Sequence, residues 1–492
     1  MKSLAEIIAW LQTSTKKPVI LVEVPGVLNA PGTYYLSNRP YVTKATDTPS
    51  NTRYDPSIVG GVTFNESLSL SMAVNISYGD IEIDNTDGSK DTWLNYVWAN
   101  RAISIYIGDS SWPKDDFRLI FSGIVFDIAT RNRNTVNIII NDKLQKLNNP
   151  ISEITLPLVN STSEVLIPIT FGEVFNATPI VTDNIVNTLE YQVHPGPIED
   201  IIEVRDNGVP VNITKSLTTG KFTLSQAPYG QITCSVQGHK NPTYYNDIAN
   251  LIKEIVKNYG PTANRLVDAD IDLTNFSSFS TNNTQPVGFY STSRENILSV
   301  CNQLASSIGA QVTMTSTGLL RLVKLDLPPT GTAYTVSYND IEAKSISITE
   351  KPPVVGAQKL GYAKNWTTQT GSLAAGLPSN STVVFEKEWL YSIYENATVI
   401  TNYKQTSEPV EESTLLLKKT HTDTEALRRN TLWGTPRFVY SMKAYAHLLP
   451  VELGDSITLY DTRFGLNNGK TGLVINISRN WLAGRVVIGV LI

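Results

Sequence analysis

A glycine-rich segment near the C-terminus holds the residue types of a phosphate-binding loop. Residues 465–471 read Gly-Leu-Asn-Asn-Gly-Lys-Thr, one residue short of the loop that cradles nucleotide phosphates. That loop needs a strand before it and a helix after it, because the N-terminus of the helix must face the phosphates. Here residues 472–477 have the pattern of a strand. We therefore interpret residues 465–471 as a hairpin loop.

Four acidic side chains between Asp80 and Asp87 have the composition of a calcium loop. A helix-loop-helix calcium site has glycine at its sixth position and glutamate at its twelfth, where this chain has Asn85 and Asp91. Isoleucines alternate with the first acids, which is typical of a strand with one face in solvent. We interpret the acids as this solvent face, running into an Asp-Gly turn, and keep a loop-bound cation as the alternative.

The remaining reactive residue types form no recognisable site. The two cysteines, Cys234 and Cys301, fall in segments that read as a strand and a helix, and we interpret them as small buried hydrophobes. No zinc spacing, serine nucleophile motif or singled-out carboxylate pair is present in the sequence. We therefore predict no catalytic, cofactor-binding or metal-binding residues and no enzyme activity. The histidines, which lie far apart in the sequence, are His194, His239, His421 and His447.

Several tryptophans accompany a tyrosine-rich composition. Aromatic rings stack on sugar faces, so a glycan-binding platform is one interpretation of these residues. Burial in cores and subunit interfaces is the interpretation that we favour, because Trp and Tyr supply a large apolar area with a polar handle. The residues concerned are Trp366, Trp389, Trp433 and Trp481.

The overall composition excludes several classes of protein. The chain has 492 residues, a net charge of −5 and only 17% charged residues. A dedicated nucleic-acid binder would need a basic face for phosphates, whereas a neutral or acidic passage would let DNA slide without sticking. No run approaches the roughly 20 apolar residues of a membrane helix, residues 1–12 make no convincing signal peptide, and no disulfide framework is evident.

Two stretches of the chain share the pattern of an antiparallel β-meander. The first contains strand-like runs at residues 101–109, 122–128 and 135–140, and the second at 453–459, 472–477 and 484–491. Gly123 and Gly472 each begin a run of three apolar residues, a polar residue and isoleucine. This similarity predicts a duplicated β-unit, with one copy at each end of the chain.

The meanders fit into four predicted domains of a mainly β fold. Residues 1–150 form a first tube-like β-barrel unit, in which 18–24 and 33–36 are strands and 68–72 and 81–83 alternate as strands. Residues 151–240 form an inserted, small β-sandwich-like module, with a type I′ turn at Asn207-Gly208. Residues 241–345 form an α+β domain, and residues 346–492 form a second β-barrel unit with one bracing helix.

Three helices are predicted from their apolar periodicity. The first covers residues 248–259 and stops at Gly260, and the second starts with Ser293 as N-cap and stops at Gly309. A hairpin of residues 311–314 and 319–323 completes the α+β domain. The third helix begins at Thr422, forms a capping box with Glu425 and ends near residues 434–436, as a brace across the mouth of the second barrel.

The order of these motifs resembles the tail hub proteins of tailed bacteriophages, which are central baseplate or tail-tip subunits. The resemblance extends over most of the chain. Its matching segments are residues 79–88, 192–194, 206–211, 361–367 and 453–492.

This resemblance implies a structural homotrimer, in which two barrels per chain make a ring with pseudo-six-fold symmetry. Such a ring would cap the tail tube and adapt it to a three-fold central tip or fibre. The implied partners are distal tail or tail tube proteins, the tip or fibre protein and a tape measure protein, with DNA passing through the lumen without specific binding. The implied location is the virion, after assembly in the host cytoplasm. The alternatives are a receptor- or glycan-binding tail adhesin and, less favoured, a tail-associated peptidoglycan hydrolase.

Overall fold

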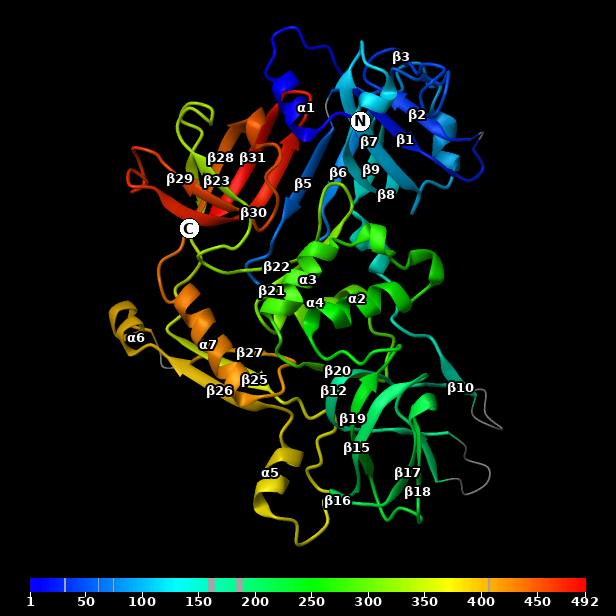
Figure 1. Ribbon diagram of the computed structural model, residues 1–492, viewed down its shortest axis with the longest axis vertical. Coiled ribbons are helices and arrows are strands. Elements are labelled where there is room, and N and C mark those ends of the chain that lie inside the picture. The colour runs from blue at the N-terminus through cyan, green and yellow to red at the C-terminus, as the bar shows by residue number, and fades with distance from the viewer. Residues whose placement is uncertain (31, 61, 74, 158–163, 183–188, 406–407) are drawn as a thin grey trace.

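A computed structural model describes residues 1–30, 32–60, 62–73, 75–157, 164–182, 189–405 and 408–492. The molecule is elongated, with a large sheet at one end, a helical layer in the middle and smaller sheets at the other end (Figure 1). Strands make up 39% of the chain and helices 20%, so the prediction of a mainly β fold is confirmed.

The large sheet contains strands from both ends of the chain. Its 13 strands include β5 (Thr63–Ser67), which pairs with β30 (Lys470–Asn480) and so joins residues near the N-terminus to residues near the C-terminus. Strand β29 (Ser456–Leu459) lies beside β30, and β23 (Ala333–Val336) pairs with β29 in parallel. The remaining order is β2 (Tyr34–Ser37), β1 (Pro18–Val24), β7 (Ala102–Asp109), β8 (Arg118–Asn132), β9 (Thr135–Asn141), β6 (Tyr78–Asp84), β5 (Thr63–Ser67), β30 (Lys470–Asn480), β31 (Arg485–Leu491), β28 (Val439–Tyr445) and β24 (Ser347–Glu350).

The core of this sheet is a single apolar cluster to which both ends of the chain contribute. Ile81 and Ile138 lie in the same cluster as Ile477 and Ile488 because period-two alternation turns every second side chain to one face. Helix α1 (Leu4–Leu11) packs on this cluster and carries a capping box between Ser3 and Glu6. The sequence interpretation of residues 1–12 missed this short helix. A short hairpin of β3 (Tyr41–Val42) and β4 (Arg53–Tyr54) lies beside the outer end of the sheet.

One predicted strand is absent from the sheet. Residues 68–72 leave β5 and turn away, because Leu68 donates its backbone N–H to Ile475 and Ser69 donates to the side chain of Gln311. Met72 has φ of 60°, a left-handed value that ends the extended pattern. The prediction of a strand at 68–72 is therefore wrong.

The middle layer consists of helices and a hairpin. The helix predicted at residues 248–259 is confirmed, and Gly260 follows it with φ of 74°. The second predicted helix is confirmed but its N-cap is wrong, since Asn296 rather than Ser293 accepts the first backbone N–H groups. The hairpin is confirmed, and the serine-rich helix α3 was missed. The elements are α2 (Ile248–Asn258), α3 (Leu273–Asn282), α4 (Ile297–Ser306), β21 (Ala310–Met314) and β22 (Leu320–Lys324).

The far end of the molecule holds two small sheets around one core. The predicted turn at Asn207-Gly208 is confirmed, with φ of 46° and 85° between paired strands. Residues 158–163 and 183–188 of the predicted sandwich module lie outside the described residues. The sheets contain β12 (Ile169–Ala177), β15 (Ile198–Asp206), β16 (Val209–Pro210), β19 (Ile232–His239) and β20 (Gly288–Ser291), and β13 (Ile180–Val181), β14 (Glu190–Gln192), β17 (Ile213–Ser216) and β18 (Lys221–Leu224); β10 (Thr155–Pro157) and β11 (Glu164–Leu166) form a separate pair.

A three-stranded sheet and three helices lie in the sequence between β24 and β28 of the large sheet. Helix α7 packs on β25 and β26 of that sheet, so the prediction of a brace across a barrel mouth is not what the structure shows. The capping box is also wrong, because Glu425 is buried and binds Arg428 and Arg429 on the same helix. The elements are β25 (Ala357–Tyr362), β26 (Leu390–Glu395), β27 (Val410–Ser413), α5 (Ser379–Glu386), α6 (Ala397–Tyr403) and α7 (Lys419–Trp433).

Candidate functional site: the junction of two sheet repeats

The large sheet contains the same four-stranded unit twice. We call β6–β9 the N-terminal repeat and β28–β31 the C-terminal repeat. In each repeat the chain visits the strands in the same order, and the sheet places them as second, third, fourth and first. A flanking strand pairs with the first strand of each repeat, β5 with β6 and β24 with β28. The duplicated meander predicted from the sequence is confirmed.

A β-bulge occurs at the same place in both repeats. In β8, Val125 pairs with Ile140 and Asp127 with Ile139, so Phe126 is the extra residue. In β30, Val474 pairs with Val490 and Asn476 with Gly489, so Ile475 is the extra residue. Each extra residue comes three positions after the glycine of the repeat, Gly123 or Gly472. A bulge bends a strand and increases its twist, so both repeats bend at equivalent points.

The two glycines lie in equivalent surroundings. Gly123 faces Ile103 of the preceding strand, and Gly472 faces Ile457. A Cβ atom on Gly123 would lie 2.3 Å from the carbonyl oxygen of Asn141, and one on Gly472 would lie 2.3 Å from that of Leu491. Backbone atoms cannot move away as a flexible side chain can, so both positions require glycine because of close backbone approach.

The repeats are joined by β5, which pairs with the part of β30 that follows the bulge. Asn476 faces Ser67 at one end of this junction, and Asn480 faces Thr63 at the other. The first part of β30 instead pairs with β29 along the same edge. Strand β30 therefore uses one edge for two partners, β29 of its own repeat and β5, the strand that flanks the N-terminal repeat.

A buried ion pair crosses the junction. The guanidinium of Arg479 contacts Glu66, and their side chains are only 2% and 1% exposed. Arg479 also donates to the carbonyl of Leu449 at 3.1 Å and to that of Val451. A buried pair stabilises a fold only if its remaining donors and acceptors are satisfied. These carbonyls accept from Arg479, whereas Oε1 of Glu66 has no hydrogen-bond partner among the described residues.

The carboxyl groups around Arg479 respond to burial. Burial raises the pKa of Glu66, and the charge of Arg479 opposes this rise. Burial also raises the pKa of Glu452, whose carboxyl lies 3.4 Å from Arg479, to about 7. Glu66 on β5 and Glu452 in the loop before β29 therefore meet at Arg479 of β30, which links three segments of the chain.

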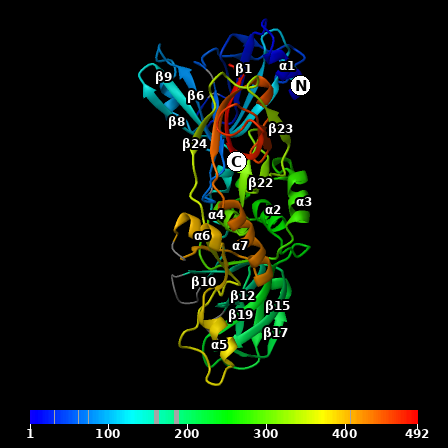
Figure 2. The same ribbon diagram turned by 90° about the vertical axis from the view of Figure 1, so that its left-hand side faces the viewer.

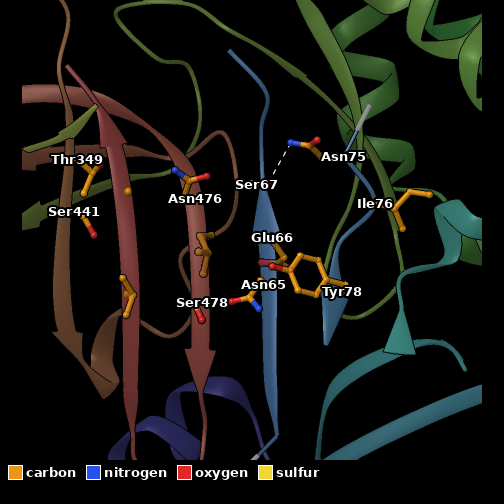
Figure 3. A pocket seen from close by; sticks show the side chains of 13 residues that line it. Asn65, Glu66, Ser67, Asn75, Ile76, Tyr78, Thr349, Ser441, Asn476 and Ser478 are labelled. Carbon is orange, nitrogen blue, oxygen red and sulfur yellow. Dashed lines mark hydrogen bonds between the residues drawn. The ribbon is translucent and has the colours of Figure 1, made fainter. Parts of the chain in front are cut away.

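A polar hollow of about 490 Å³ lies over the junction of β5 and β30 (Figure 3). Asn65 and Ser67 of β5 and Asn476 and Ser478 of β30 line it, with Ser441 of β28 on the far side. Asn75 donates a hydrogen bond to Ser67 at 3.2 Å. Among the described residues that line the hollow, Glu66 is the only carboxylate and no lysine or arginine is present. The surface is therefore polar but almost uncharged.

The segments with reactive residue types have structural roles. The glycine-rich segment 465–471 connects β29 to β30, so its interpretation as a hairpin loop is confirmed. Asp80 lies on strand β6 and binds Arg131 and Asn137, which confirms the strand. Within the described residues, no group of three or more His, Cys, Asp or Glu side chains is arranged to hold a metal ion.

Two histidines that are distant in the sequence meet in the structure. His194 and His239 lie 3.3 Å apart between ring nitrogens, and the hydroxyl of Tyr259 lies 2.9 Å from His239. Burial lowers the pKa of His194 to about 3, helped by the nearby His239. Cys234 and Cys301 are buried, as predicted. No sequence spacing indicated the histidine pair, because its members come from β19 and from the loop after β14.

The four tryptophans lie in two separate regions. Trp481 is buried in the core of the large sheet, and Trp433 packs against the same core. Trp366 and Trp389 pack against the core of the helical layer, and the ammonium of Lys364 lies over both rings. Within the described residues, no helix has the length and apolar character to cross a membrane.

No protein-family model matches the sequence, and no curated protein sequence matches it significantly. Solved structures match it over almost its full length. A 43 kDa tail protein of prophage MuSo2 from Shewanella oneidensis has 10% identity and a TM-score of 0.40, and covers 96% of this chain and 98% of its own. A tail protein from Neisseria meningitidis has 9% identity and a TM-score of 0.41, with 97% of each chain covered.

A type VI secretion system component from E. coli has 7% identity and a TM-score of 0.33, and covers 88% of this chain and 73% of its own. At these low values the matches describe similar chains and assign no function to this one. The three structures named are two tail proteins and a component of a type VI secretion system.

Proposed function

We propose that this chain is the hub subunit of a phage tail tip or baseplate. It forms a homotrimer whose ring has pseudo-six-fold symmetry, caps the tail tube and adapts the tube to a three-fold central tip or fibre. The protein acts through the shape of its interfaces and performs no catalysis. The observation that carries the proposal is the pair of repeats, with equivalent glycines and bulges, side by side in one sheet.

The duplication supplies the symmetry that such an adapter needs. Two similar repeats in each of three chains make six similar units around one axis, while the remaining domains occur three times. A six-fold tube can then stack on the repeats, and a three-fold tip can bind the other domains. No conformational switch is required, because the two symmetries are built into one chain.

The polar hollow over the junction supports a passage for DNA. If the repeats close into a ring with this face inward, the lumen is lined by neutral Asn, Ser and Thr side chains. Such a wall offers hydrogen bonds but few cations, and phosphate binding depends on cations. DNA would pass without being retained. The partners on this proposal are tail tube or distal tail proteins, a tip or fibre protein and a tape measure protein. The protein would reside in the virion tail after assembly in the host cytoplasm.

The test is the solution mass of the purified full-length chain, followed by electron microscopy of the particles. We expect a species of three chains whose class averages show a central hole surrounded by six densities. A chain that stays monomeric at high concentration, and forms no ring when mixed with the tube and tip proteins of the same tail, would contradict the proposal.

A further inference from the structure

The two repeats differ in what covers one edge of their central strand. In the C-terminal repeat, the part of β30 after the bulge pairs with β5. The equivalent part of β8, residues 127–132, pairs with β9 on one edge. Among the described residues, nothing pairs with its other edge. Unpaired backbone groups along a strand favour the addition of another strand.

The side chains along this part of β8 are correspondingly exposed. Phe126 is 48% exposed, whereas its equivalent in the other repeat, Ile475, is 1% exposed. Asp127, Thr130 and Arg131 are also exposed. The ends of β8 and β9 project from the body of the molecule in the side view (Figure 2). This edge is open to a partner.

The opposite end of the sheet presents the strand that would fit. Strand β24 stands to the C-terminal repeat as β5 stands to the N-terminal repeat, since Ile348 faces Tyr440 where Phe64 faces Gly79. All four residues of β24 are exposed. Ile348 is 39% exposed, whereas Phe64 is 6% exposed in the core. Among the described residues, β24 pairs only with β28.

We propose that β24 of one copy pairs, antiparallel, with residues 127–132 of β8 in the next copy. This contact repeats between chains the junction that β5 and β30 make within each chain, and it rests on the proposed function. The intrachain register gives the intermolecular one. A second bulge in β8 adds one residue at 130–131, so that Asn132 faces Thr135 as Asn480 faces Arg485. Thr63 faces Asn480 within the chain, and Ser347 therefore faces Asn132 of the next copy.

The chemistry of the two edges agrees with this register. Ile348, exposed in the single chain, falls opposite the bulge at residues 130–131, as Phe64 falls opposite Arg479 in the junction, and is covered there. Lys351, directly after β24, comes within one residue of Asp127, and opposite charges across strands attract. Pro352 has no backbone N–H, so the pairing ends there.

The proposed contact between copies can also close into a ring. The C-terminal repeat of each chain binds the N-terminal repeat of the next chain, so the contact is head to tail. Head-to-tail contacts close into a ring when their rotations add up to a full turn. With equivalent junctions within and between chains, a ring of three chains contains six junctions.

Disulfide cross-linking of the full-length chain tests the register. In the Asn132→Cys, Ser347→Cys double variant the two thiols face each other across copies, within the Cα separation of 4.4–6.8 Å typical of disulfides. We expect oxidation to give a ladder of covalent dimers and trimers on non-reducing gels. Cys234 and Cys301 are buried and do not compete for oxidation.

Three kinds of control match this variant. The Thr63→Cys, Asn480→Cys variant places thiols at the equivalent intrachain positions, and it should close within one chain and give no ladder. The two single variants, Asn132→Cys and Ser347→Cys, should give no ladder. The Asn132→Cys, Ile348→Cys variant places the thiols on opposite faces of the paired strands, because side chains alternate, and should cross-link at least about tenfold less.

The outcomes separate this inference from the proposed function. A trimer by mass, combined with an intrachain disulfide in the control and no ladder in the test variant, would overturn the β24–β8 contact and leave the hub proposal standing. A ladder that extends past three chains would support the contact and contradict ring closure. Absence of both trimer and ladder would contradict the contact and the hub proposal.

A charge exchange gives a second measurement that does not depend on oxidation. Asp127→Lys and Lys351→Asp each place like charges near the contact, and we expect each to weaken association by about 2- to 5-fold at low salt. The double exchange restores opposite charges and should recover the wild-type association constant. If the losses of association in the two single variants simply add up in the double exchange, without recovery, the two residues do not meet.

Discussion

At the scale of single residues, the buried ion pair of Arg479 and Glu66 should contribute to the stability of the junction between the repeats. Removing one member of a buried pair leaves the other charged and desolvated, which costs about 3–5 kcal/mol. We expect Arg479→Ala to lower the free energy of unfolding by this amount in urea titrations. The matched control is Arg485→Ala, which removes an exposed pair with Glu342 and should cost less than about 1 kcal/mol. Equal losses in the two variants would show that burial of Arg479 contributes nothing.

The second residue-scale prediction concerns acid stability. His194 is buried, receives the backbone N–H of Thr170 and faces His239 and Tyr259, so its protonation is disfavoured in the fold. With a pKa of about 3 in the fold against 6.5 unfolded, the unfolded chain binds a proton that the folded chain does not. Stability is therefore full above pH 6.5 and falls toward pH 3, by about 1.4 kcal/mol for each pH unit.

The variant His194→Asn replaces this imidazole with an amide, which does not titrate. We expect it to be less stable than the wild type at pH 7 but to lose less stability between pH 6.5 and pH 4. Urea midpoints measured across this range check the slope. An unchanged slope in the variant would show that His194 does not cause the acid sensitivity.

At the scale of elements, the two meanders should respond equally to the same change. An added Cβ at Gly123 or Gly472 meets a backbone carbonyl in the neighbouring strand. We expect Gly123→Ala and Gly472→Ala each to cost about 1–3 kcal/mol, as overpacking of a fixed core does. Gly371→Ala, which meets nothing within 4 Å, is the control and should stay within about 0.5 kcal/mol. A large difference between Gly123→Ala and Gly472→Ala in thermal or urea unfolding would show that the repeats are not mechanically equivalent.

At the scale of the whole molecule, the neutral wall over the junction should not retain DNA. We expect the wild-type protein to show no binding of double-stranded DNA at physiological salt, at protein concentrations up to about 10 μM. The triple variant Ser441→Lys, Asn476→Lys, Ser478→Lys places cations on the same face. It should bind DNA with an affinity that falls as salt rises, because the bound phosphates release counterions. Tight, salt-sensitive binding by the wild type in gel-shift or anisotropy measurements would contradict a non-adhesive lumen.

The sequence by itself determined the local elements of this protein. Alternation and turn residues predicted the meander strands, the Asn207-Gly208 turn and the helix that ends at Gly260, because these signals depend on neighbours along the chain. The glycine pattern at Gly123 and Gly472 also revealed the duplication, since close backbone approach leaves glycine as the residue that fits. Local signals failed where a distant contact won. Residues 68–72 follow Gln311 and Ile475 instead of their own alternation, and Glu425 pairs with arginines instead of capping a helix.

Only the tertiary structure decided how the elements meet. That β5 pairs with β30, that Arg479 reaches Glu66 and that His194 reaches His239 depend on contacts between residues tens to hundreds of positions apart. No spacing in the sequence encodes such contacts, because they follow from which apolar faces pack together once the strands and helices have formed. The same packing leaves one edge of β24 and one edge of the end of β8 without a partner strand in the described part of the chain, and this asymmetry between two similar repeats is visible only when the whole sheet is assembled.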